Sequence, residues 1–290
     1  MSPTILPGRP QTVGVVIVNW RAPEMTLQAV ACVLAQSVAA TRIFVVDNGS
    51  SDGSVDLLRA APPFKDGSAT LIESERNLGF GGGCNLALRA IAAAGLDFAW
   101  LLNNDAEPET DCLCELLRAA SAAPVPVGLV GSLLIDPEGD ADPHFGSWMH
   151  PVTLSCGAIG PASSDERHFS WMTAASLLVA VPALEAVGGF DEGYFMYWED
   201  ADLNLRIRKA GFSICGAQGA VVRHHAGTSS SSDTVRRYLW HFASQDRFIA
   251  SHIPMPQFAR LRLRLKFLAK AALDRDGARL GALVRRILGS

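Results

Sequence analysis

Alternating apolar runs and helical patterns over the first 105 residues constrain the fold of this chain more than any other feature. Four runs are rich in β-branched and other apolar residues, as in strands buried within a sheet, and they lie at 13–18, 42–46, 70–73 and 98–102. Helical patterns separate them, at 23–37, 55–60 and 86–94. This alternation predicts an α/β fold with a mostly parallel sheet flanked by helices.

Polar side chains follow each of these predicted strands at its carboxyl end. They are Asn19, Asp47, Asn77 and the run Asn103, Asn104 and Asp105. The carboxyl ends of parallel strands meet at one edge, where such sheets place their ligands. Asp47 is typical of a turn, or it accepts the ring N–H of a pyrimidine, whereas Asp105 suits a divalent cation on a diphosphate.

A glycine-rich loop, Gly79–Gly83, follows the third predicted strand. It does not have the G-x-G-x-x-G spacing of dinucleotide-binding folds, because Cys84 stands where the last glycine would be. The chain also has no P-loop G-K-[ST] motif. The loop therefore carries neither of these two phosphate-binding signatures.

A second polar cluster, Glu199, Asp200 and Asp202, opens a predicted helix that ends near Gly211. Acidic residues at a helix start suit the helix dipole, and Asp202 is placed to pair with Arg206 four residues on. Glu199 and Asp200 follow a run of aromatic residues, which predicts a partly dry pocket around them. Such a carboxylate can act as a general base.

The remaining segments of the body are harder to assign. We expect strands at 128–135, 171–181 and 220–223, a helical turn at 183–187, and surface or acceptor-side loops at 137–170. The histidines at 144, 150 and 168 receive no role. His224 ends the last of these strands, so it is a candidate metal ligand beside Asp105, with His225 as the alternative.

Length and composition indicate a globular protein. The chain has 290 residues, of which 19% are charged, enough for one large domain or one domain with a tail. The first residues do not resemble a signal peptide, and the longest apolar run, 171–184, contains Pro182 and is too short to span a bilayer. We therefore expect a cytoplasmic protein whose six cysteines, without CxxC spacing, are small buried thiols.

The carboxyl-terminal segment differs in charge from the rest. Residues 257–290 hold nine Lys or Arg and two Asp, a net charge of +7 on a chain of net charge −4. Helices are predicted at 234–252, 258–272 and 278–288, although strict alternation over 260–266 is closer to a strand period. One hypothesis is peripheral contact with an anionic membrane at its inner face. The alternatives are packing on the body or a homodimer contact.

Seven segments, in order along the chain, resemble family 2 inverting glycosyltransferases of the GT-A fold, and most closely the rhamnosyltransferase branch that builds bacterial cell-surface polysaccharides. The segments are Val-Asn-Trp at 18–20, Val-Val-Asp-Asn-Gly-Ser-Ser-Asp-Gly-Ser at 45–54, Asn-Leu-Gly-Phe-Gly-Gly-Gly-Cys-Asn at 77–85, Leu-Asn-Asn-Asp at 102–105, Gly-Gly-Phe-Asp-Glu at 188–192, Trp-Glu-Asp-Ala-Asp-Leu at 198–203 and His-His-Ala-Gly-Thr-Ser at 224–229. The resemblance covers roughly residues 12–230. It implies a nucleotide-sugar donor, a divalent metal (Mg²⁺ or Mn²⁺), and a saccharide or lipid-linked saccharide acceptor.

The resemblance also implies roles for single residues. Asp47 would bind the nucleobase, with Asn19 lining the same pocket and Asn77, Asn104 and the loop from Gly79 to Gly83 near the nucleotide. Asp105, Asn103 and His224 would hold the metal, although Asn103 replaces the first acid of the family's D-x-D motif. Asp200 falls on the position of the catalytic base, beside Glu199, and Ala174 would lie next to the sugar.

The implied organisation is a catalytic domain over 1–233, with a nucleotide-binding half at 12–125 and an acceptor half at 126–233, followed by a helical basic extension over 234–290. Rhamnose from dTDP-rhamnose is the expected donor sugar, and UDP-sugars fit Asp47 equally, because both bases offer the same ring N–H. A sugar nucleotidyltransferase and a non-catalytic binding module are the competing hypotheses. No nucleic-acid partner is expected.

Overall fold

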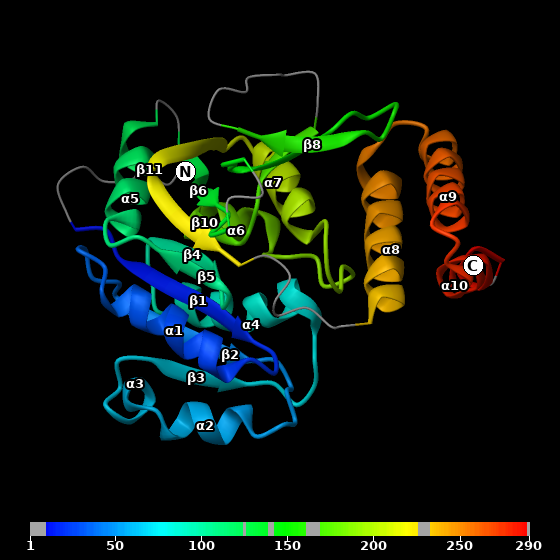
Figure 1. The fold of residues 1–290 in the computed structure, drawn as a ribbon. Helices are drawn as coiled ribbons and strands as arrows, with labels where there is room; N and C mark the ends of the chain where they lie inside the picture. Colours follow the sequence, from blue (N-terminus) through cyan, green and yellow to red (C-terminus); the bar gives the residue numbers. More distant parts are fainter. Residues whose placement is uncertain (1–9, 124–125, 139–141, 161–168, 226–232, 289–290) are drawn as a thin grey trace.

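The computed structural model describes residues 10–123, 126–138, 142–160, 169–225 and 233–288. His168 and the end of the last motif, 226–229, lie outside the described residues. Eight strands form the central sheet in the order β3-β2-β1-β4-β10-β6-β11-β5 (Figure 1). Their bounds are β1 Val13–Asn19, β2 Arg42–Asp47, β3 Thr70–Glu73, β4 Phe98–Asn103, β5 Ala106–Pro108, β6 Val127–Ile135, β10 Ser176–Ala180 and β11 Ser213–His224.

The first half of the sheet is parallel, as predicted. Strands β3, β2, β1 and β4 pair in parallel, and β1 aligns Asn19 with Asp47 at the end of β2. The second half is mixed, since β10 runs antiparallel to both β4 and β6, and β5 runs antiparallel to β11. The strand ends that carry the polar motifs therefore meet at one edge.

Helices cover both faces of this sheet. They are α1 Pro23–Leu34, α2 Ser54–Ala60, α3 Pro62–Lys65, α4 Gly79–Ala93, α5 Cys112–Ala122, α6 Val181–Val187 and α7 Glu199–Lys209. The sequence-based start of α4 at Leu86 is wrong, because the glycine-rich run forms the first turns of this helix. A side chain at Gly79 would place its Cβ 2.1 Å from the carbonyl oxygen of Phe195, so glycine permits close packing there.

The segment predicted as loops, 137–170, holds most of a small three-stranded sheet. It consists of β7 Gly146–Met149, β8 Cys156–Ile159 and β9 Phe169–Met172, in the order β8-β7-β9. The single strand predicted over 171–181 is also wrong, because residues 173–175 turn the chain from β9 into β10. These strands have four residues each, too few for a pattern of period two to stand out.

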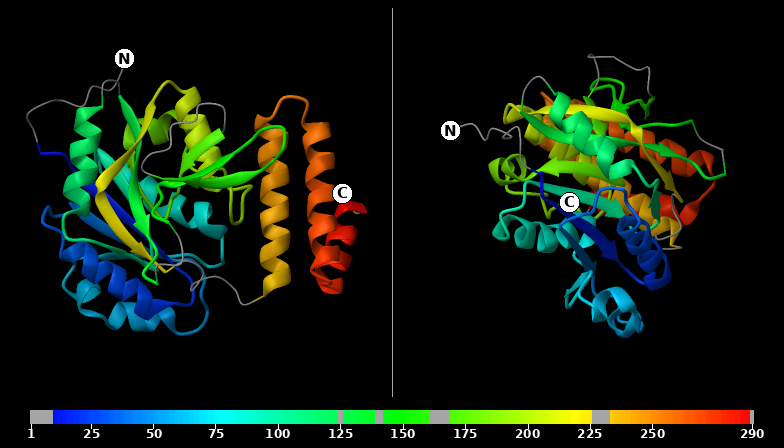
Figure 2. Two further views of the ribbon diagram at one scale, coloured as in Figure 1. Left: turned by 45° about the horizontal axis from the view of Figure 1, so that its top comes forward. Right: turned by 90° about the vertical axis from the view of Figure 1, so that its left-hand side faces the viewer.

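The carboxyl-terminal helices form a layer at one side of the molecule, beyond α7 and the small sheet (Figures 1 and 2). They are α8 Thr234–His252, α9 Pro256–Leu273 and α10 Gly277–Leu288. The alternating segment 260–266 is helical, and its leucines point both ways: Leu263 is buried, whereas Leu261 and Leu265 are exposed. Among the described residues, no helix is long and apolar enough to cross a membrane.

Two clusters of buried side chains stabilise the molecule. The larger fills the space between the central sheet and its helices. The smaller joins the small sheet and α7 to the carboxyl-terminal helices, through residues such as Trp171, Trp198, Phe248, Leu263 and Leu283. The carboxyl-terminal segment thus packs on the body, which was one of the sequence-based alternatives, and this cluster crosses the predicted domain boundary at 233.

Candidate active site

A cavity of about 490 Å³ opens at the carboxyl ends of β1, β2 and β4. Its wall combines polar strand ends with the beginning of α7 and side chains from the small sheet and α8. The predicted site residues that line it are Asn77, Gly79, Asn103, Asn104, Asp105, Glu199, Asp200 and His224, together with Ala174. The fold therefore brings together side chains from 77 to 224 in a single cavity.

Asp105, Asn103 and His224 lie close together on one side of this cavity. His224 Nε2 is 3.2 Å from Asp105 Oδ1, and Asn103 Nδ2 is 3.3 Å from His224 Nε2. The imidazole of His225 lies elsewhere, with Nε2 3.8 Å from Glu107 Oε1, so His224 is the histidine whose side chain faces the Asp105 carboxylate. The pairing of β11 with β5 sets this arrangement, because it aligns His224 with Ala106.

The donor atoms of this cluster fit a small divalent cation. Two ligands at right angles and about 2.1 Å from an octahedral ion lie about 3 Å apart, close to the separation of Asp105 Oδ1 and His224 Nε2. The part of the chain that the structure describes has no group of three or more His, Cys, Asp or Glu side chains suited to a metal. Further ligands would therefore be the amide oxygen of Asn103, water and substrate oxygens.

Glu199 and Asp200 are the first two residues of α7 and directly follow an unusual turn. Tyr197 and Trp198 both have positive φ, at 69° and 67°, which side chains of this size rarely adopt. Strained backbone of this kind persists where the surrounding structure holds it, often at functional sites. Here the turn directs the first residues of α7 into the cavity.

Burial raises the pKa of both carboxyl groups at this position. Glu199 is buried, its Oε2 has no hydrogen-bond partner among the described residues, and the adjacent Asp200 raises its pKa further. Burial also raises the pKa of Asp200. The backbone N–H groups of Ala174 and Ala201 donate to its carboxylate at 3.4 and 2.8 Å, and these hydrogen bonds offset part of that rise. Proton uptake by Asp200 is therefore easier than for an ordinary aspartate.

Asp202, by contrast, pairs with Arg206, as the sequence predicted. Its carboxylate accepts from Arg206 Nε at 2.7 Å and lies 2.7 Å from His252 Nε2 of α8. Arg206 in turn donates to the carbonyl oxygens of Val187 and Gly189. This buried network joins α7 to α8, beside the two carboxylates that face the cavity.

Asn19 and Asp47 do not line the cavity but lie behind its wall. Asn19 Nδ2 donates to Asp47 Oδ2 at 2.7 Å, and Ser50 donates to the same carboxylate through Oγ at 2.6 Å and through its backbone N–H at 3.1 Å. Both side chains are almost completely buried. Their place in the cavity wall is taken by Trp20 and Asn48, the next residues along each chain segment.

Asn48 connects the end of β2 to the start of α4. Its Nδ2 donates to the carbonyl oxygen of Gly79 at 2.9 Å, and its Oδ1 accepts from the backbone N–H of Leu78 at 2.9 Å. Asn77 and Gly79 line the cavity beside it, whereas Gly83 is buried in α4 against Val18 and Asn48. The glycine run is therefore close to the cavity only at its beginning.

Sequence reasoning missed several lining residues. His241 reaches the cavity from α8, and burial, with Lys266 and Lys270 adding to it, lowers its pKa to about 4. Trp171 lies 5.2 Å from Trp198 between ring centres, and Ser147 and Cys156 come from the small sheet. The aromatic composition of 194–198 was the only local signal of this wall.

Comparison with known proteins supports the family and the fold. Residues 14–148 match the model of glycosyl transferase family 2. The chain is 30% identical over 232 residues to N-acetylglucosaminyl-diphospho-decaprenol L-rhamnosyltransferase of Mycobacterium tuberculosis, an alignment that covers 72% of this chain and 74% of that protein. It is 35% identical over 80 residues to the rhamnosyltransferase WbbL of Escherichia coli, covering 28% of this chain and 30% of that protein.

Solved structures support the same fold. A mannosyltransferase from Pyrobaculum calidifontis, solved with GDP-mannose and Mn²⁺, superposes with a TM-score of 0.60 at 18% identity, covering 97% of this chain and 81% of that one. TarS of S. aureus superposes with a TM-score of 0.57 at 12% identity, covering 90% of this chain and 43% of that one. With this fold, this cavity and these relatives, the chain belongs to glycosyl transferase family 2, in its rhamnosyltransferase-like branch.

Proposed function

We propose that this glycosyltransferase moves rhamnose from dTDP-rhamnose to a lipid-linked saccharide or a growing cell-surface polysaccharide, with inversion at the anomeric carbon. One observation carries the proposal: a metal-type cluster and a buried carboxylate pair line the same cavity. The mycobacterial relative is named an L-rhamnosyltransferase of N-acetylglucosaminyl-diphospho-decaprenol. This name supports rhamnose as the donor sugar and a lipid-linked saccharide as the acceptor.

Asp105, His224 and the amide oxygen of Asn103 would hold Mg²⁺ or Mn²⁺ against the donor diphosphate. The ion, when bound, stabilises the negative charge that develops on the departing nucleoside diphosphate. Asn77, Gly79 and Asn104 would line the path of the nucleotide. Trp20 and Asn48 border the same end of the cavity, with Asp47 and Asn19 holding their strands in place from behind.

Asp200 would act as the general base. Inversion in one step requires a carboxylate that takes the proton of the acceptor hydroxyl as it attacks the anomeric carbon, and no protein nucleophile. The raised pKa of Asp200 suits this role, because a stronger base accepts that proton more readily. Glu199, protonated beside it, would keep the pair at a single negative charge.

The aromatic wall would receive the acceptor. Trp171, Tyr197 and Trp198 line the cavity next to Asp200, and sugar rings pack well on such apolar faces. Because the carboxyl-terminal helices contribute His241 to this wall, they would shape the acceptor site. Their basic sequence also supports peripheral contact with the inner face of a membrane, where a lipid-linked acceptor would lie.

A thermal-shift titration with a panel of nucleotide sugars and Mn²⁺ tests the proposal, since the true donor stabilises the fold by mass action. We expect dTDP-rhamnose to give the largest shift, and Asp105→Ala to abolish the dependence on metal. A larger shift with a UDP-sugar would assign that donor in its place. Stabilisation without turnover of the donor would favour a non-catalytic module, and synthesis of a nucleotide sugar from a nucleoside triphosphate would favour a nucleotidyltransferase.

A further inference from the structure

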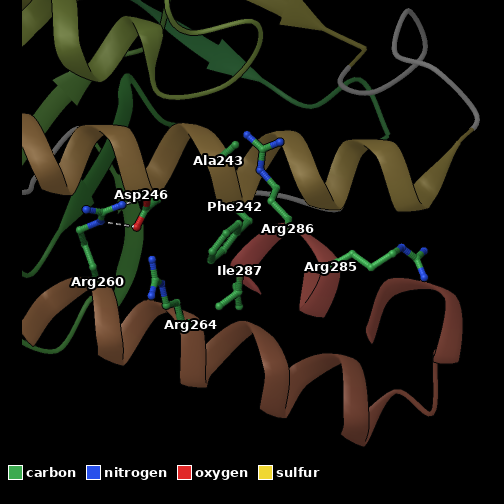
Figure 3. A pocket seen from close by; sticks show the side chains of 8 residues that line it. All are labelled: Phe242, Ala243, Asp246, Arg260, Arg264, Arg285, Arg286 and Ile287. Carbon is green, nitrogen blue, oxygen red and sulfur yellow. Dashed lines mark hydrogen bonds and ion pairs between the residues drawn. The ribbon is translucent and has the colours of Figure 1, made fainter. Parts of the chain in front are cut away.

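A second cavity, of about 500 Å³, lies among the three carboxyl-terminal helices, away from the site described above (Figure 3). Phe242 and Ile287 form its apolar floor. Four arginines also line the cavity: Arg260 and Arg264 come from α9, and the exposed Arg285 and Arg286 come from α10. Among the described residues, Asp246 of α8 is the one carboxylate that lines this cavity.

The charges in this cavity are not balanced. Arg260 donates to both oxygens of Asp246, at 2.8 and 2.6 Å, so this pair neutralises itself. Arg264 has a buried Nε with no hydrogen-bond partner among the described residues. No ion pair involving Arg264, Arg285 or Arg286 is present within the described part of the chain. A buried guanidinium nitrogen without an acceptor is costly, so the cavity is suited to an anion.

The outer face of α9 beside this cavity is apolar and exposed. Phe258, Leu261 and Leu265 follow one another at helical spacing, and each leaves more than half of its surface exposed. Leu261 and Leu265 directly follow Arg260 and Arg264 along the helix. On the other edge of this face, Arg262 and Lys266 donate to the carbonyl oxygens of Val152 and Leu154, which holds the exposed Val152 alongside.

We propose that the arginine pocket binds the phosphate of an anionic phospholipid headgroup, with the exposed face of α9 in the adjoining acyl region. A phosphate accepts two parallel hydrogen bonds from one guanidinium, and Arg264, whose buried Nε has no partner within the described chain, is placed to donate them, while Arg286 lines the same pocket from α10. An apolar helical face bordered by basic side chains is typical of helices that lie in the membrane interface. The segment's net charge of +7 complements an anionic surface.

This inference deepens the proposed membrane contact, but it does not depend on the transfer reaction. The test measures binding of the full chain to vesicles of phosphatidylcholine, with and without phosphatidylglycerol, in the absence of donor and acceptor. The pocket variant is Arg264→Gln with Arg286→Gln. The matched control is Arg275→Gln with Arg118→Gln, which removes the same charge at exposed positions outside the pocket.

We expect wild type to bind only the vesicles with phosphatidylglycerol. Each basic residue near an anionic leaflet raises membrane affinity about fivefold. The affinity of the pocket variant for these vesicles should therefore fall by more than about 25-fold, and clearly further than that of the control. Leu261→Ser with Leu265→Ser should also weaken binding. Equal losses of vesicle affinity in the pocket variant and the control would overturn the proposal that the pocket binds a lipid phosphate. Equal binding of wild type to both vesicle types would overturn it too.

Two further measurements distinguish a lipid headgroup from a free phosphate and from a second copy of this chain. Calorimetry with inorganic phosphate and glycerol 3-phosphate would overturn the membrane assignment if either bound while vesicles did not. Analytical ultracentrifugation would overturn it if the pocket variant converted a dimer to monomers. Melting temperatures establish that each variant is folded. Asp200→Asn should bind vesicles as wild type does, so a failure of transfer and a failure of membrane binding are distinguishable.

Discussion

At the scale of single residues, the two carboxylates that open α7 carry the clearest chemical expectations. Both face the same cavity, and burial raises both pKa values. Their neighbour Asp202 is tied to Arg206 and His252. Within four residues, local structure thus separates two acids that face the cavity from a third that is tied to Arg206 and His252.

Asp200→Asn should abolish transfer while leaving nucleotide binding nearly unchanged. An amide cannot take the acceptor proton, and loss of a general base costs about 10²- to 10⁴-fold in rate. Turnover of the donor in the presence of acceptor, together with calorimetric binding of dTDP, measures the two effects separately. Retention of more than about a tenth of the activity, well above this range, would move the base to Glu199 or elsewhere.

Glu199→Gln should change how stability depends on pH. The pKa of Glu199 is raised from 4.5 to about 8 in the folded protein, so the native state binds more protons than the unfolded chain between these values. The contribution of Glu199 to the free energy of unfolding is therefore fully present below pH 4.5 and is lost as the pH rises toward about 8. The loss is at most about 1.4 kcal/mol per pH unit.

The melting temperature of Glu199→Gln should therefore rise relative to that of wild type as the pH increases from 4.5 to about 8. Glu75→Gln, which removes an exposed carboxylate outside the cavity, provides the control for the loss of one charge. Parallel profiles for wild type and Glu199→Gln would mean that Glu199 is ionised in the folded protein.

Asp47→Ala distinguishes a base-binding role from a structural one. Removing the carboxylate leaves buried donors of Asn19 and Ser50 unsatisfied, which should lower stability by about 1–3 kcal/mol. If Asp47 also binds the base, pyrimidine diphosphates should lose affinity more than purine diphosphates. Equal weakening of both, in binding assays at a temperature where the variant is folded, would assign Asp47 to the loop alone.

At the scale of elements, the start of α4 and the turn before α7 depend on each other. Phe80 donates its backbone N–H to the carbonyl oxygen of Phe195 at 3.1 Å, and the absent Cβ of Gly79 leaves room for this contact. The same turn carries the strained Tyr197 and Trp198 that direct Glu199 into the cavity. Packing between these two elements therefore supports the turn that places Glu199 at the cavity.

Gly79→Ala should reduce both stability and transfer. Its φ of +78° disfavours alanine by about 1–2 kcal/mol, and the added Cβ also collides with Phe195. Gly95→Ala is the matched control, because Gly95 has φ +66° and no atom within 4 Å of an added Cβ. Equal losses in melting temperature and activity for both variants would show that the contact with Phe195 has no role.

At the scale of the whole molecule, the carboxyl-terminal helices belong to the catalytic body. Their buried side chains pack against Trp171 and Trp198, His252 reaches Asp202, and His241 lines the cavity. Truncation after Pro256 would remove Leu263 and Phe267 and uncover the buried Phe242 of α8, so a loss of folding could not be told from a loss of membrane binding. Single substitutions on α9 separate these contributions.

Leu263→Ala should destabilise the protein by about 2–5 kcal/mol, because its side chain is fully buried. Leu261→Ala, two residues earlier on the same helix, should stay within about 0.5 kcal/mol of wild type, since its side chain is exposed. Denaturant unfolding measures both. Similar losses for the two variants would contradict the packing of α9 on α8.

Much of the parallel half of the sheet could be predicted from the sequence because its signals are local. Buried parallel strands are continuous apolar runs, and the polar residues that follow them must meet at one edge once the strands pair in parallel. The resemblance of seven short segments added the chemistry of Asp105, His224 and Asp200. Comparison with known proteins confirmed the family and the fold.

The sequence by itself determined the parallel half of the sheet, the family, and the carboxylates Asp105, Glu199 and Asp200 that line the cavity. Only the tertiary structure decided that Asp47 and Asn19 lie behind the wall, that His224 and not His225 faces Asp105, and that α8 completes the site. The physical reason is that these outcomes depend on contacts between distant segments. Hydrophobic periodicity reports which face of an element is buried, but it carries no information on the element that covers that face.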